Sequence, residues 1–435
     1  MIKKFAVPRG ASDILPEEIF IWREMESKLR KILNLYGYKE IRTPLFEETE
    51  LFARSVGQTS DIVQKQMLNL AAQPKPGEKS VKLSGLSLRP EGTASVVRSY
   101  IQNGLDRKER LSKLFYIGPM FRGERPQKGR LRQFSQIGVE AIGPGSSSAY
   151  LDAEVISLSV NILKALGIKD FKLKINSLGS SEDKKEFAKV LKKQLGKKIK
   201  DLCSDCQQRF ERNVFRILDC KNKECKEAVR SLKLDYSFLS AKSFDYYSQV
   251  KEALKTFSTK FEESIDLVRG LDYYTHVVFE ISSAHLGSQD ALGAGGRYSN
   301  LVAQLGGPSV DAVGFALGME RILLSMPKVK PLQESGIDVF LICLDENITK
   351  KAVQILEKLR RQDIAADMSY QILSLKSQMR SADKSGARFA LILGEDEDKR
   401  GIVALKCMQT GNQKEIKASP GDINSLVDAI KKKGC

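Results

Sequence analysis

The chain has 435 residues, with 71 lysines and arginines against 54 aspartates and glutamates, so its formal net charge is +17 at pH 7. This length is enough for two or three domains with separate cores, and the positive charge favours a polyanionic partner such as a nucleic acid. No apolar run could span a bilayer or serve as an export signal, and seven cysteines do not make a disulfide framework in so long a chain, which predicts a soluble cytoplasmic protein without a membrane partner.

The first predicted element is an amphipathic helix that begins near Pro16 and ends at Gly37. Proline in the first turn and the acidic residues after it are typical of a helix start, and apolar residues then recur at spacings of three and four. Residues 38–45 follow as a strand, at whose end Pro44 has no backbone N–H to donate. This pattern fits an ordinary core helix and strand as well as it fits a dimer interface.

Further strands are predicted from short apolar runs that are mixed with turn residues. They lie at 114–117, 135–142, 277–281 and 312–317. Such runs are typical of an antiparallel sheet. Strands and helices do not alternate strictly along this part of the chain, so the predicted fold class of residues 1–326 is α+β and not a doubly wound parallel fold.

Residues 171–260 differ in composition, with 22 lysines and arginines against 12 aspartates and glutamates. We interpret the region of about 180–260 as an inserted, mostly helical module. The alternative is a lysine-rich helical face that is solvated. The region also holds four cysteines spaced as in four-thiolate zinc sites, and the alternative for these is four reduced thiols. The candidate ligands of a structural Zn²⁺ are Cys203, Cys206, Cys220 and Cys225.

The last part of the chain is predicted to be a separate domain at 337–435. Two prolines mark the preceding segment, 327–336, as a linker. An apolar strand at 337–343 and an amphipathic helix at 348–361 then begin an alternation that continues with strand-like runs farther on. This alternation predicts a compact α/β domain of about 100 residues.

Two basic segments are the most informative motifs in the sequence. The first is Phe-Arg-Gly-Glu at 121–124, followed by Arg-Gln-Phe at 132–134. The second is Gly-Phe-Ala-Leu-Gly-Met-Glu-Arg at 314–321. Each places one arginine in a rigid frame, made by strand residues in the first case and by a small-residue turn entering a helix in the second. A fixed guanidinium fork is suited to a triphosphate.

Together with three more segments, these motifs resemble the class II aminoacyl-tRNA synthetases, and specifically the bacterial type of the histidyl-tRNA synthetase family. The additional segments are Tyr-Gly-Tyr at 36–38 through Pro44, Arg-Gly-Leu-Asp-Tyr-Tyr at 269–274, and Gly-Gly-Arg-Tyr at 295–298. The five motifs occur in the family's order, and the resemblance runs nearly end to end.

The resemblance implies an antiparallel-sheet catalytic core with a helical insertion, followed by a small α/β anticodon-binding domain. It implies a homodimer and ATP-dependent activation of histidine to histidyl-adenylate, followed by transfer to the 3′ end of tRNA(His). One alternative is a non-catalytic paralogue, either a regulatory subunit of histidine biosynthesis or a sensor of uncharged tRNA. Another is a generic tRNA-binding scaffold.

The resemblance also assigns roles to three catalytic arginines. Arg122 would hold the α-phosphate of ATP, and Arg321 the γ-phosphate, while Arg269 would replace one of the usual catalytic metal ions. Glu124 and Phe134 would complete the ATP site, and Mg²⁺ would bridge the β- and γ-phosphates. Positive charge is needed at these positions because negative charge grows on the α-phosphate and on the departing pyrophosphate during attack.

The histidine site is assigned in the same way. The α-amino group would be received by Glu91, Thr93 and Gln136. The imidazole would lie between Glu140 and Tyr274, because neutral imidazole has one donor and one acceptor nitrogen. Arg269 and Tyr273 complete the set of histidine-binding residues that the resemblance implies. If the two tyrosines lay on a strand, alternation would turn only one toward the pocket, and Tyr274 is the one we expect.

The loop at 125–130 is the implied contact with the acceptor end of tRNA, through Gln127, Lys128 and Arg130. A plain solvent-exposed hairpin is the alternative. The chain departs from the common family pattern at Gly123, at Ser135 and at Ser299-Asn300, which leaves the named ligands in place. The two histidines, His276 and His285, occupy no evident general-base position, so we expect the phosphate of the adenylate or a carboxylate to take the proton.

Overall fold

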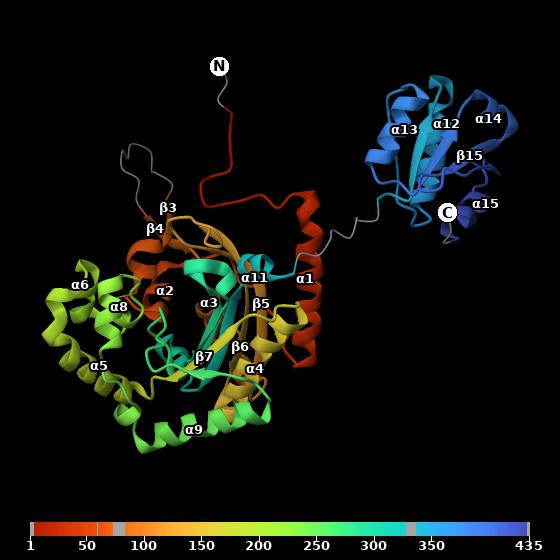
Figure 1. Ribbon diagram of the computed structural model, residues 1–435. Coiled ribbons are helices and arrows are strands. Elements are labelled where there is room, and N and C mark those ends of the chain that lie inside the picture. The colour runs from red at the N-terminus through yellow and green to blue at the C-terminus, as the bar shows by residue number, and fades with distance from the viewer. Residues whose placement is uncertain (1–3, 59, 73–82, 328–335, 433–435) are drawn as a thin grey trace. The chain divides into compact units, whose positions relative to one another are not determined.

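The computed structural model describes residues 4–58, 60–72, 83–327 and 336–432 (Figure 1). The chain divides into two compact units, Met1–Lys328 and Val329–Cys435. Almost all of the predicted linker at 327–336 lies outside the described residues. Within the described residues, no helix is both long enough and apolar enough to cross a membrane.

The first unit is built on a large sheet with helices on both faces. Its strands are β1 (Lys39–Glu40), β2 (Phe46–Glu48), β3 (Leu68–Ala71), β4 (Leu83–Leu88), β5 (Ser112–Phe121), β6 (Gln133–Ile142), β7 (Lys172–Ser177), β8 (Glu262–Glu263), β9 (Thr275–Ser282), β10 (Ala291–Arg297) and β11 (Ala312–Gly318). Its helices are α1 (Pro16–Leu35), α2 (Thr49–Val56), α3 (Thr93–Gln102), α4 (Ala149–Ala165), α5 (Ser181–Leu195), α6 (Ser204–Arg212), α7 (Phe215–Leu218), α8 (Lys223–Arg230), α9 (Ala241–Thr256), α10 (Leu301–Gln304) and α11 (Met319–Ser325).

The large sheet has eight strands in the order β1-β5-β6-β11-β10-β9-β7-β8. Its pairs are antiparallel except β1 with β5 and β7 with β8, at the two edges. The four predicted apolar runs lie inside β5, β6, β9 and β11. The predicted α+β class and the antiparallel core are therefore confirmed. A smaller antiparallel sheet has the order β2-β4-β3.

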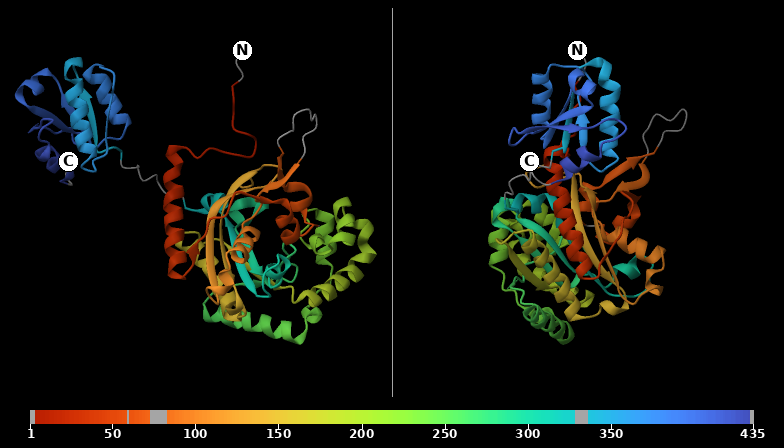
Figure 2. Two further views of the ribbon diagram at one scale, coloured as in Figure 1. Left: turned by 180° about the vertical axis from the view of Figure 1, so that it is seen from behind. Right: turned by 90° about the vertical axis from the view of Figure 1, so that its right-hand side faces the viewer.

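The alternation of side chains along β5 separates two cores. Phe115 belongs to the core that α1, α4 and α9 form on one face of the sheet, where Met25 and Leu29 of α1 are fully buried. Leu114 and Tyr116 turn to the other face, where they pack with α3 and the helices that follow β7. Figures 1 and 2 show α1 lying beside β5 in views from the front and from behind.

The strand predicted at 38–45 is shorter than expected. Only Lys39–Glu40 pairs, with Leu114 and Phe115 of β5. The carbonyls of Thr43 and Pro44 instead accept hydrogen bonds from the guanidinium of Arg89, at 3.0 and 3.4 Å. A distant side chain thus satisfies the backbone groups that a neighbouring strand would otherwise bind, and sequence patterns do not indicate such a partner.

The region predicted as a mostly helical insertion contains α5 to α9, between β7 and β8. Figure 1 shows α5, α6 and α8 gathered beside the sheet. α5 begins with a capping box between Ser180 and Asp183. The core of α5 to α8 is continuous with the core on the α3 face of the sheet, since Phe187 and Phe210 belong to the same cluster as Tyr116, whereas α9 packs on the other face. The helices are therefore packed as part of the first unit.

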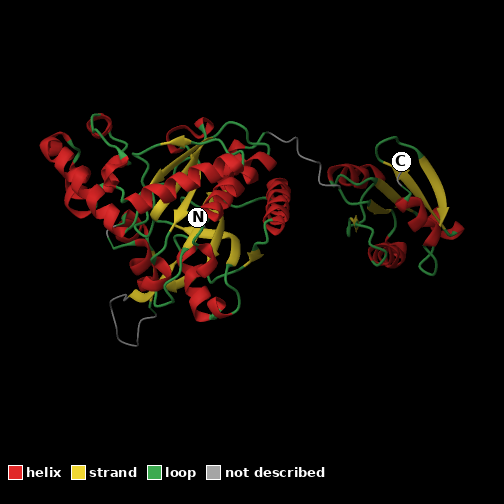
Figure 3. Ribbon diagram, turned by 90° about the horizontal axis from the view of Figure 1, so that it is seen from below, coloured by secondary structure: helices red, strands yellow, loops and turns green. Residues whose placement is uncertain are grey.

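The second unit is a five-stranded mixed sheet with helices, as Figure 3 shows by colour. Its sheet order is β13-β12-β14-β15-β16, in which β12 is parallel to β13 and β14 and the other pairs are antiparallel. The elements are β12 (Val339–Cys343), α12 (Thr349–Arg360), β13 (Ala366–Met368), α13 (Leu375–Lys384), β14 (Phe389–Leu393), α14 (Glu395–Arg400), β15 (Ile402–Cys407), β16 (Gln413–Lys417) and α15 (Asn424–Lys431).

Candidate active site

A cavity lies on the α3 face of the large sheet, over β6, β10 and β11. Segments between Glu91 and Arg321 contribute to it, including the turn before β9 and the start of α11. Most of the predicted site residues line this cavity, namely Glu91, Thr93, Arg122, Glu124, Arg130, Phe134, Gln136, Arg269, Tyr273, Tyr274 and Arg321. Of the other predicted residues, Glu140 lies beneath it, Gln127 and Lys128 lie in the adjoining turn, and the four cysteines lie in the helical insertion.

Arg122 and Arg269 are each held by a protein group that leaves part of the guanidinium facing the cavity. The Nε atom of Arg122 donates to the carbonyl of Pro90 at 2.8 Å, and its guanidinium lies 5.1 Å from the ring centroid of Phe134. Nη1 of Arg269 donates to Glu280 Oε2 at 2.5 Å. Each side chain is therefore fixed before a ligand binds, which reduces the entropy that binding must overcome.

Arg321 is fixed by backbone carbonyls from two other segments. Its Nε atom donates to Gly129 at 2.8 Å, and Nη1 donates to Ala291 at 2.6 Å. Gly129 belongs to a tight turn, in which Gln127 and Arg130 exchange backbone hydrogen bonds, and its φ of +70° favours glycine. The turn at 127–130 thus positions the arginine that the second basic motif supplies.

The guanidinium groups raise the positive potential of the cavity. Burial lowers the pKa of Arg321, and the charges of Arg130 and Arg122 lower it further. Burial likewise lowers the pKa of Arg130, with a further contribution from Arg122. Groups of like charge that lie this close repel one another unless an anion lies between them. The arrangement is suited to a polyanion such as a triphosphate.

Acceptors for an ammonium group lie at the start of α3 and on β6. Both oxygens of the Glu91 carboxylate accept backbone N–H groups at the helix start, from Thr93 at 2.7 Å and Ala94 at 2.9 Å. The hydroxyl of Thr93 donates to Glu140 at 2.7 Å, so its lone pairs remain available. Gln136 Oε1 is buried and has no hydrogen-bond partner among the described residues. An unmatched buried acceptor that lines a cavity fits a ligand that donates.

Glu140 lies beneath the cavity, fully buried, where it accepts hydrogen bonds from Thr93 and from the hydroxyl of Tyr298. Gly314 faces it on β11, and a Cβ there would lie 2.0 Å from Glu140 Oε2. Burial raises the pKa of Glu140 to about 8, although the hydrogen bonds from Tyr298 and Thr93 act in the opposite direction. Glycine in the second basic motif thus makes room for a carboxyl group that is largely protonated at neutral pH.

This raised pKa predicts a pH-dependent contribution to stability. Between the ordinary glutamate pKa of 4.5 and the folded value of about 8, the folded protein holds a proton that the unfolded chain has lost. The free energy of unfolding therefore falls as pH rises through that range, by at most about 1.4 kcal/mol per pH unit. Glu140→Gln, which mimics the protonated group, is expected to make this decrease in the free energy of unfolding smaller.

The measurement is the thermal midpoint of wild type and Glu140→Gln at several pH values from about 5 to about 8.5. Glu91 and Asp152 are also buried and Glu320 is partly buried, all with raised pKa values, and all three are present in the two proteins. The charge of Glu91 raises the pKa of Glu140, so the difference between the two profiles reports the titration of Glu140 together with this coupling. Parallel profiles would mean that this carboxyl titrates normally in the folded protein.

The expectation that only one of Tyr273 and Tyr274 faces the pocket is wrong, because both line the cavity. They lie in a turn that ends where β9 begins, so the alternation of a strand does not apply to them. Their ring centroids are 4.6 Å apart at an interplanar angle of 50°. Burial raises the pKa of Tyr274 to about 12, so its hydroxyl keeps its proton and can donate.

The predicted tRNA-contacting residues border a second hollow next to the cavity. Gln127 and Arg130 line it, and Lys128 is exposed at the tip of the same turn. Arg9, Lys65 and further residues of the loop complete a lining with four basic side chains against a single carboxylate, that of Glu124, which forms an ion pair with Arg130. This charge pattern is suited to phosphate groups.

Glu320, which lines the cavity, and Tyr116, which packs next to it, were not among the predicted site residues. The ring of Tyr116 fits between Gly92 and Gly138, where a Cβ would lie 2.3 and 2.1 Å from ring carbon atoms. Glu320 lines the cavity, and its Oε1 accepts the backbone N–H of Ser135 at 2.7 Å. In the sequence, an acidic residue at a helix start indicates only a favourable interaction with the helix dipole, and a tyrosine on a strand indicates only a core position.

The departures from the family pattern have distinct structural contexts. Gly123 donates its backbone N–H to the carbonyl of Gln66 at 2.7 Å, in contact with the start of β3. Ser135 contributes the backbone N–H that fixes Glu320. Neither histidine lines the cavity, since His276 lies on β9 beside the ring of Tyr246 and His285 pairs with Asp170 at the surface.

Comparisons with known proteins give consistent results. A sequence model of the family described as histidyl-tRNA synthetase matches residues 10–322, and one described as an anticodon binding domain matches residues 338–433. The histidine–tRNA ligase of Moorella thermoacetica is 45% identical over 411 residues, covering 94% of this chain and 95% of that protein. That of Thermodesulfovibrio yellowstonii is 42% identical over 430 residues, covering 99% of each. The crystal structure of apo S. aureus histidyl-tRNA synthetase has a TM-score of 0.77 at 36% identity, covering 99% of this chain and 100% of that one.

Proposed function

Because this chain belongs to the histidyl-tRNA synthetase family, we propose that it is a histidine–tRNA ligase. It activates histidine with ATP to histidyl-adenylate and pyrophosphate, and it then transfers the histidyl group to the 3′ end of tRNA(His), in cytoplasmic translation. The observation that carries the proposal is that three fixed arginines, Arg122, Arg269 and Arg321, line the same cavity as the acceptors of an ammonium group.

The arginines account for the activation step. When the histidine carboxylate attacks the α-phosphorus of ATP, charge grows on the α-phosphate oxygens and on the departing pyrophosphate. Arg122 and Arg269 stabilise the former, and Arg321 the latter, from positions that are fixed before the reaction. A Mg²⁺ ion would be held by the phosphates and by cavity carboxylates such as Glu124, and it would supply positive charge to the leaving group.

The other end of the cavity accounts for the choice of amino acid. The ammonium group donates to Thr93 and to Gln136 Oε1, and the Glu91 carboxylate supplies the opposite charge. The imidazole lies between the hydroxyl of Tyr274 and the polar groups around Glu140. Sites that hydrogen-bond a polar side chain reject analogues without it by roughly 10⁴ to 10⁵ fold, because the buried groups are then left unpaired.

Transfer to tRNA uses the first unit and the second unit together. The turn with Gln127, Lys128 and Arg130 contacts the acceptor end of tRNA, beside the cavity where the adenylate forms. The second unit is similar to anticodon binding domains over residues 338–433 and binds the anticodon. The charge of +17 supports a partner of this kind.

We also propose a homodimer that forms through the N-terminal region. Several large apolar side chains are at least 40% exposed before and after α1 and around β2. They are Phe5, Val7, Ile14, Leu15, Leu35, Leu45 and Phe46. So many exposed apolar side chains in one stretch of the chain fit a surface that is covered by a partner.

The function is tested by pyrophosphate exchange into ATP, without tRNA, with each amino acid in turn. Exchange with histidine alone is expected, and phenylalanine is the matched control because its ring lacks the two nitrogens. The absence of exchange from a folded dimer would instead support the non-catalytic alternative. That alternative is less supported, since the three arginines share one cavity and the relatives named above are ligases.

A further inference from the structure

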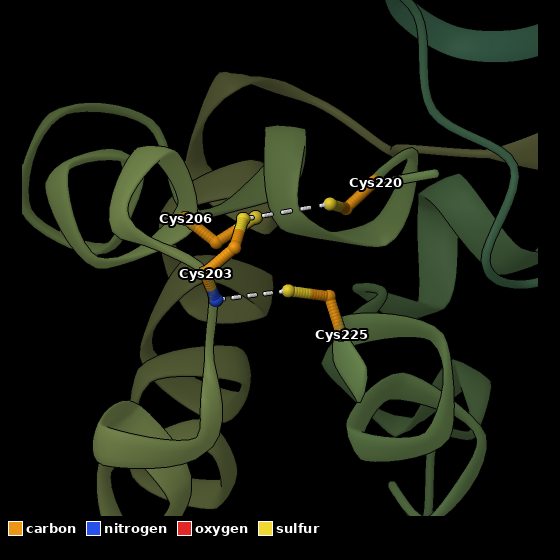
Figure 4. Close-up of side chains that lie close together, drawn as sticks. All are labelled: Cys203, Cys206, Cys220 and Cys225. Atoms are coloured by element: carbon orange, nitrogen blue, oxygen red, sulfur yellow. Dashed lines mark hydrogen bonds between the residues drawn. The ribbon is translucent and has the colours of Figure 1, made fainter. Parts of the chain in front are cut away.

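The four cysteines of the helical insertion come together in the fold. Cys203 precedes α6, Cys206 lies in its first turn, Cys220 follows α7, and Cys225 lies in α8. Their Sγ atoms all lie within 4.8 Å of one another, and each of the four thiols is free (Figure 4). We call them the four-cysteine cluster. Cys206 and Cys225 are fully buried, and the other two are partly buried.

The geometry of the cluster fits one tetrahedral metal ion. In a tetrahedral site with Zn–S distances of about 2.3 Å, neighbouring sulfur atoms are about 3.8 Å apart. The Sγ atoms of Cys203 and Cys220 are 3.9 Å apart, too far for a disulfide bond. The backbone N–H of Cys203 donates to Cys225 Sγ at 3.2 Å, as Figure 4 shows. Such a bond stabilises a thiolate, the form that binds metal.

The helices around the cluster are short. α6, α7 and α8 have 9, 4 and 8 residues, lengths at which an isolated helix is marginal in water. A Zn²⁺ ion bound by residues from all three segments would cross-link them.

These helices contact the loop that carries the two tyrosines of the cavity. One turn after Cys206, Arg209 forms an ion pair with Asp61 at 3.0 Å, and Arg216 of α7 binds the same carboxylate at 3.0 Å. Between them, Asn213 donates to the carboxylate of Asp272 at 2.9 Å. Asp272 immediately precedes Tyr273, and its backbone N–H donates to the carbonyl of Val56.

The contact with Asp61 also fixes the other side of this loop. The segment that carries Val56, Gly57 and Asp61 packs against Asp272 so closely that a Cβ at Gly57 would lie 2.1 Å from its carboxylate. A Cβ at Gly270 would lie 3.3 Å from Arg216. The loop at 269–274 is therefore held between the 56–61 segment and the helices of the four-cysteine cluster.

We propose that the four-cysteine cluster binds one Zn²⁺ ion through four thiolates, and that the ion fixes α6 and α7 as the support of the loop at 269–274. Binding displaces the thiol protons to solvent and leaves the oxidation states of sulfur and metal unchanged. The site has no open position for a substrate, so the metal is structural. The supporting role rests on the proposed function, since this loop carries the tyrosines of the histidine site.

The first test is the metal content of the full-length protein, produced without a metal-binding tag in zinc-containing medium. One equivalent of zinc per chain is expected, falling at least about tenfold in Cys220→Ser. Cys343→Ser is the matched control, because Cys343 is a free, buried cysteine of the second unit. After exchange for Co²⁺, wild type should show thiolate charge-transfer absorption and tetrahedral d–d bands.

A wild-type zinc content below about a tenth of an equivalent would overturn the proposal. Retention of zinc by the Cys220→Ser variant would also overturn the proposal. Because Cys220→Ser can also destabilise the module, wild type stripped of zinc by a chelator and then reloaded provides an independent measurement. Loading should be reversible, and the thiols of the cluster should react with a thiol reagent only after stripping.

The supporting role is tested by the Michaelis constants in pyrophosphate exchange. Stripping the metal is expected to raise KM for histidine about tenfold and KM for ATP much less, because the loop carries Tyr273 and Tyr274, whereas Arg122 and Arg321 lie outside it. Equal effects on both constants, or none, would overturn the supporting role. Metal content does not depend on exchange, so zinc without any exchange would count against the proposed function and not against the metal site.

Discussion

Replacing Arg122 with glutamine is expected to lower kcat for histidine-dependent pyrophosphate exchange by about 10³ fold. The guanidinium is fixed by the carbonyl of Pro90 and by the ring of Phe134, and it faces the same cavity as Arg321. Glutamine keeps a polar side chain of moderate length but removes the charge that balances the growing negative charge on the α-phosphate. The loss should fall mainly on kcat, because that charge is largest in the transition state.

Two further variants serve as comparisons for Arg122→Gln. Arg122→Lys keeps the charge but loses the planar fork and should recover only part of the rate. Arg400→Gln is the control, since Arg400 is an exposed residue of the second unit that pairs with Glu415. If Arg122→Gln retained kcat within a factor of about ten, Arg122 would not be a catalytic residue, and another cavity arginine would have to stabilise the α-phosphate.

Removing residues 337–435 is expected to lower kcat/KM for tRNA by about 10² to 10³ fold while pyrophosphate exchange changes little. The reason is that specific base contacts contribute about 1–3 kcal/mol each, and the second unit would supply several of them. The cavity that we propose binds histidine and ATP, in contrast, is lined entirely by residues of the first unit. The measurement compares aminoacylation with exchange on the same preparation.

The structure supports the expectation that the shortened chain folds. The hydrophobic clusters of the second unit draw on residues from Ile337 to Ile430, whereas those of the first unit end at Met326. Circular dichroism of the shortened protein is the control for folding. An equal loss of exchange and aminoacylation from a folded protein would mean that the second unit acts on the catalytic cavity as well as on tRNA.

The architecture was predictable wherever a local pattern determines the element. The runs at 114–117, 135–142, 277–281 and 312–317 all lie in strands of the large sheet, and the helix that starts at Pro16 is observed. The apolar run at 114–117 is continuous because the sheet is covered on both faces. The strand at 38–45 was overestimated, because Arg89 reaches its carbonyls from a distant segment.

The residues of the site were predictable only through motifs. The orientation of their side chains was not predictable from the sequence. The arginines were identified by their sequence context, which also places them in rigid frames. The orientation of Tyr273 and Tyr274 was not predictable, because it depends on a turn and not on the strand that follows. Glu320 was missed for a similar reason, since it lies on α11 and its hydrogen-bond partner, Ser135, lies on β6, 185 residues earlier.

The ring of Tyr116 constrains how this site can change during evolution. While the tyrosine is present, alanine is sterically excluded at both Gly92 and Gly138, because its Cβ would overlap the ring. If Tyr116 were first replaced by a smaller residue, either glycine could change. The three positions are therefore epistatic, and the order of substitution matters: a lineage that first loses the ring can accumulate side chains at the glycines that then prevent the tyrosine from returning.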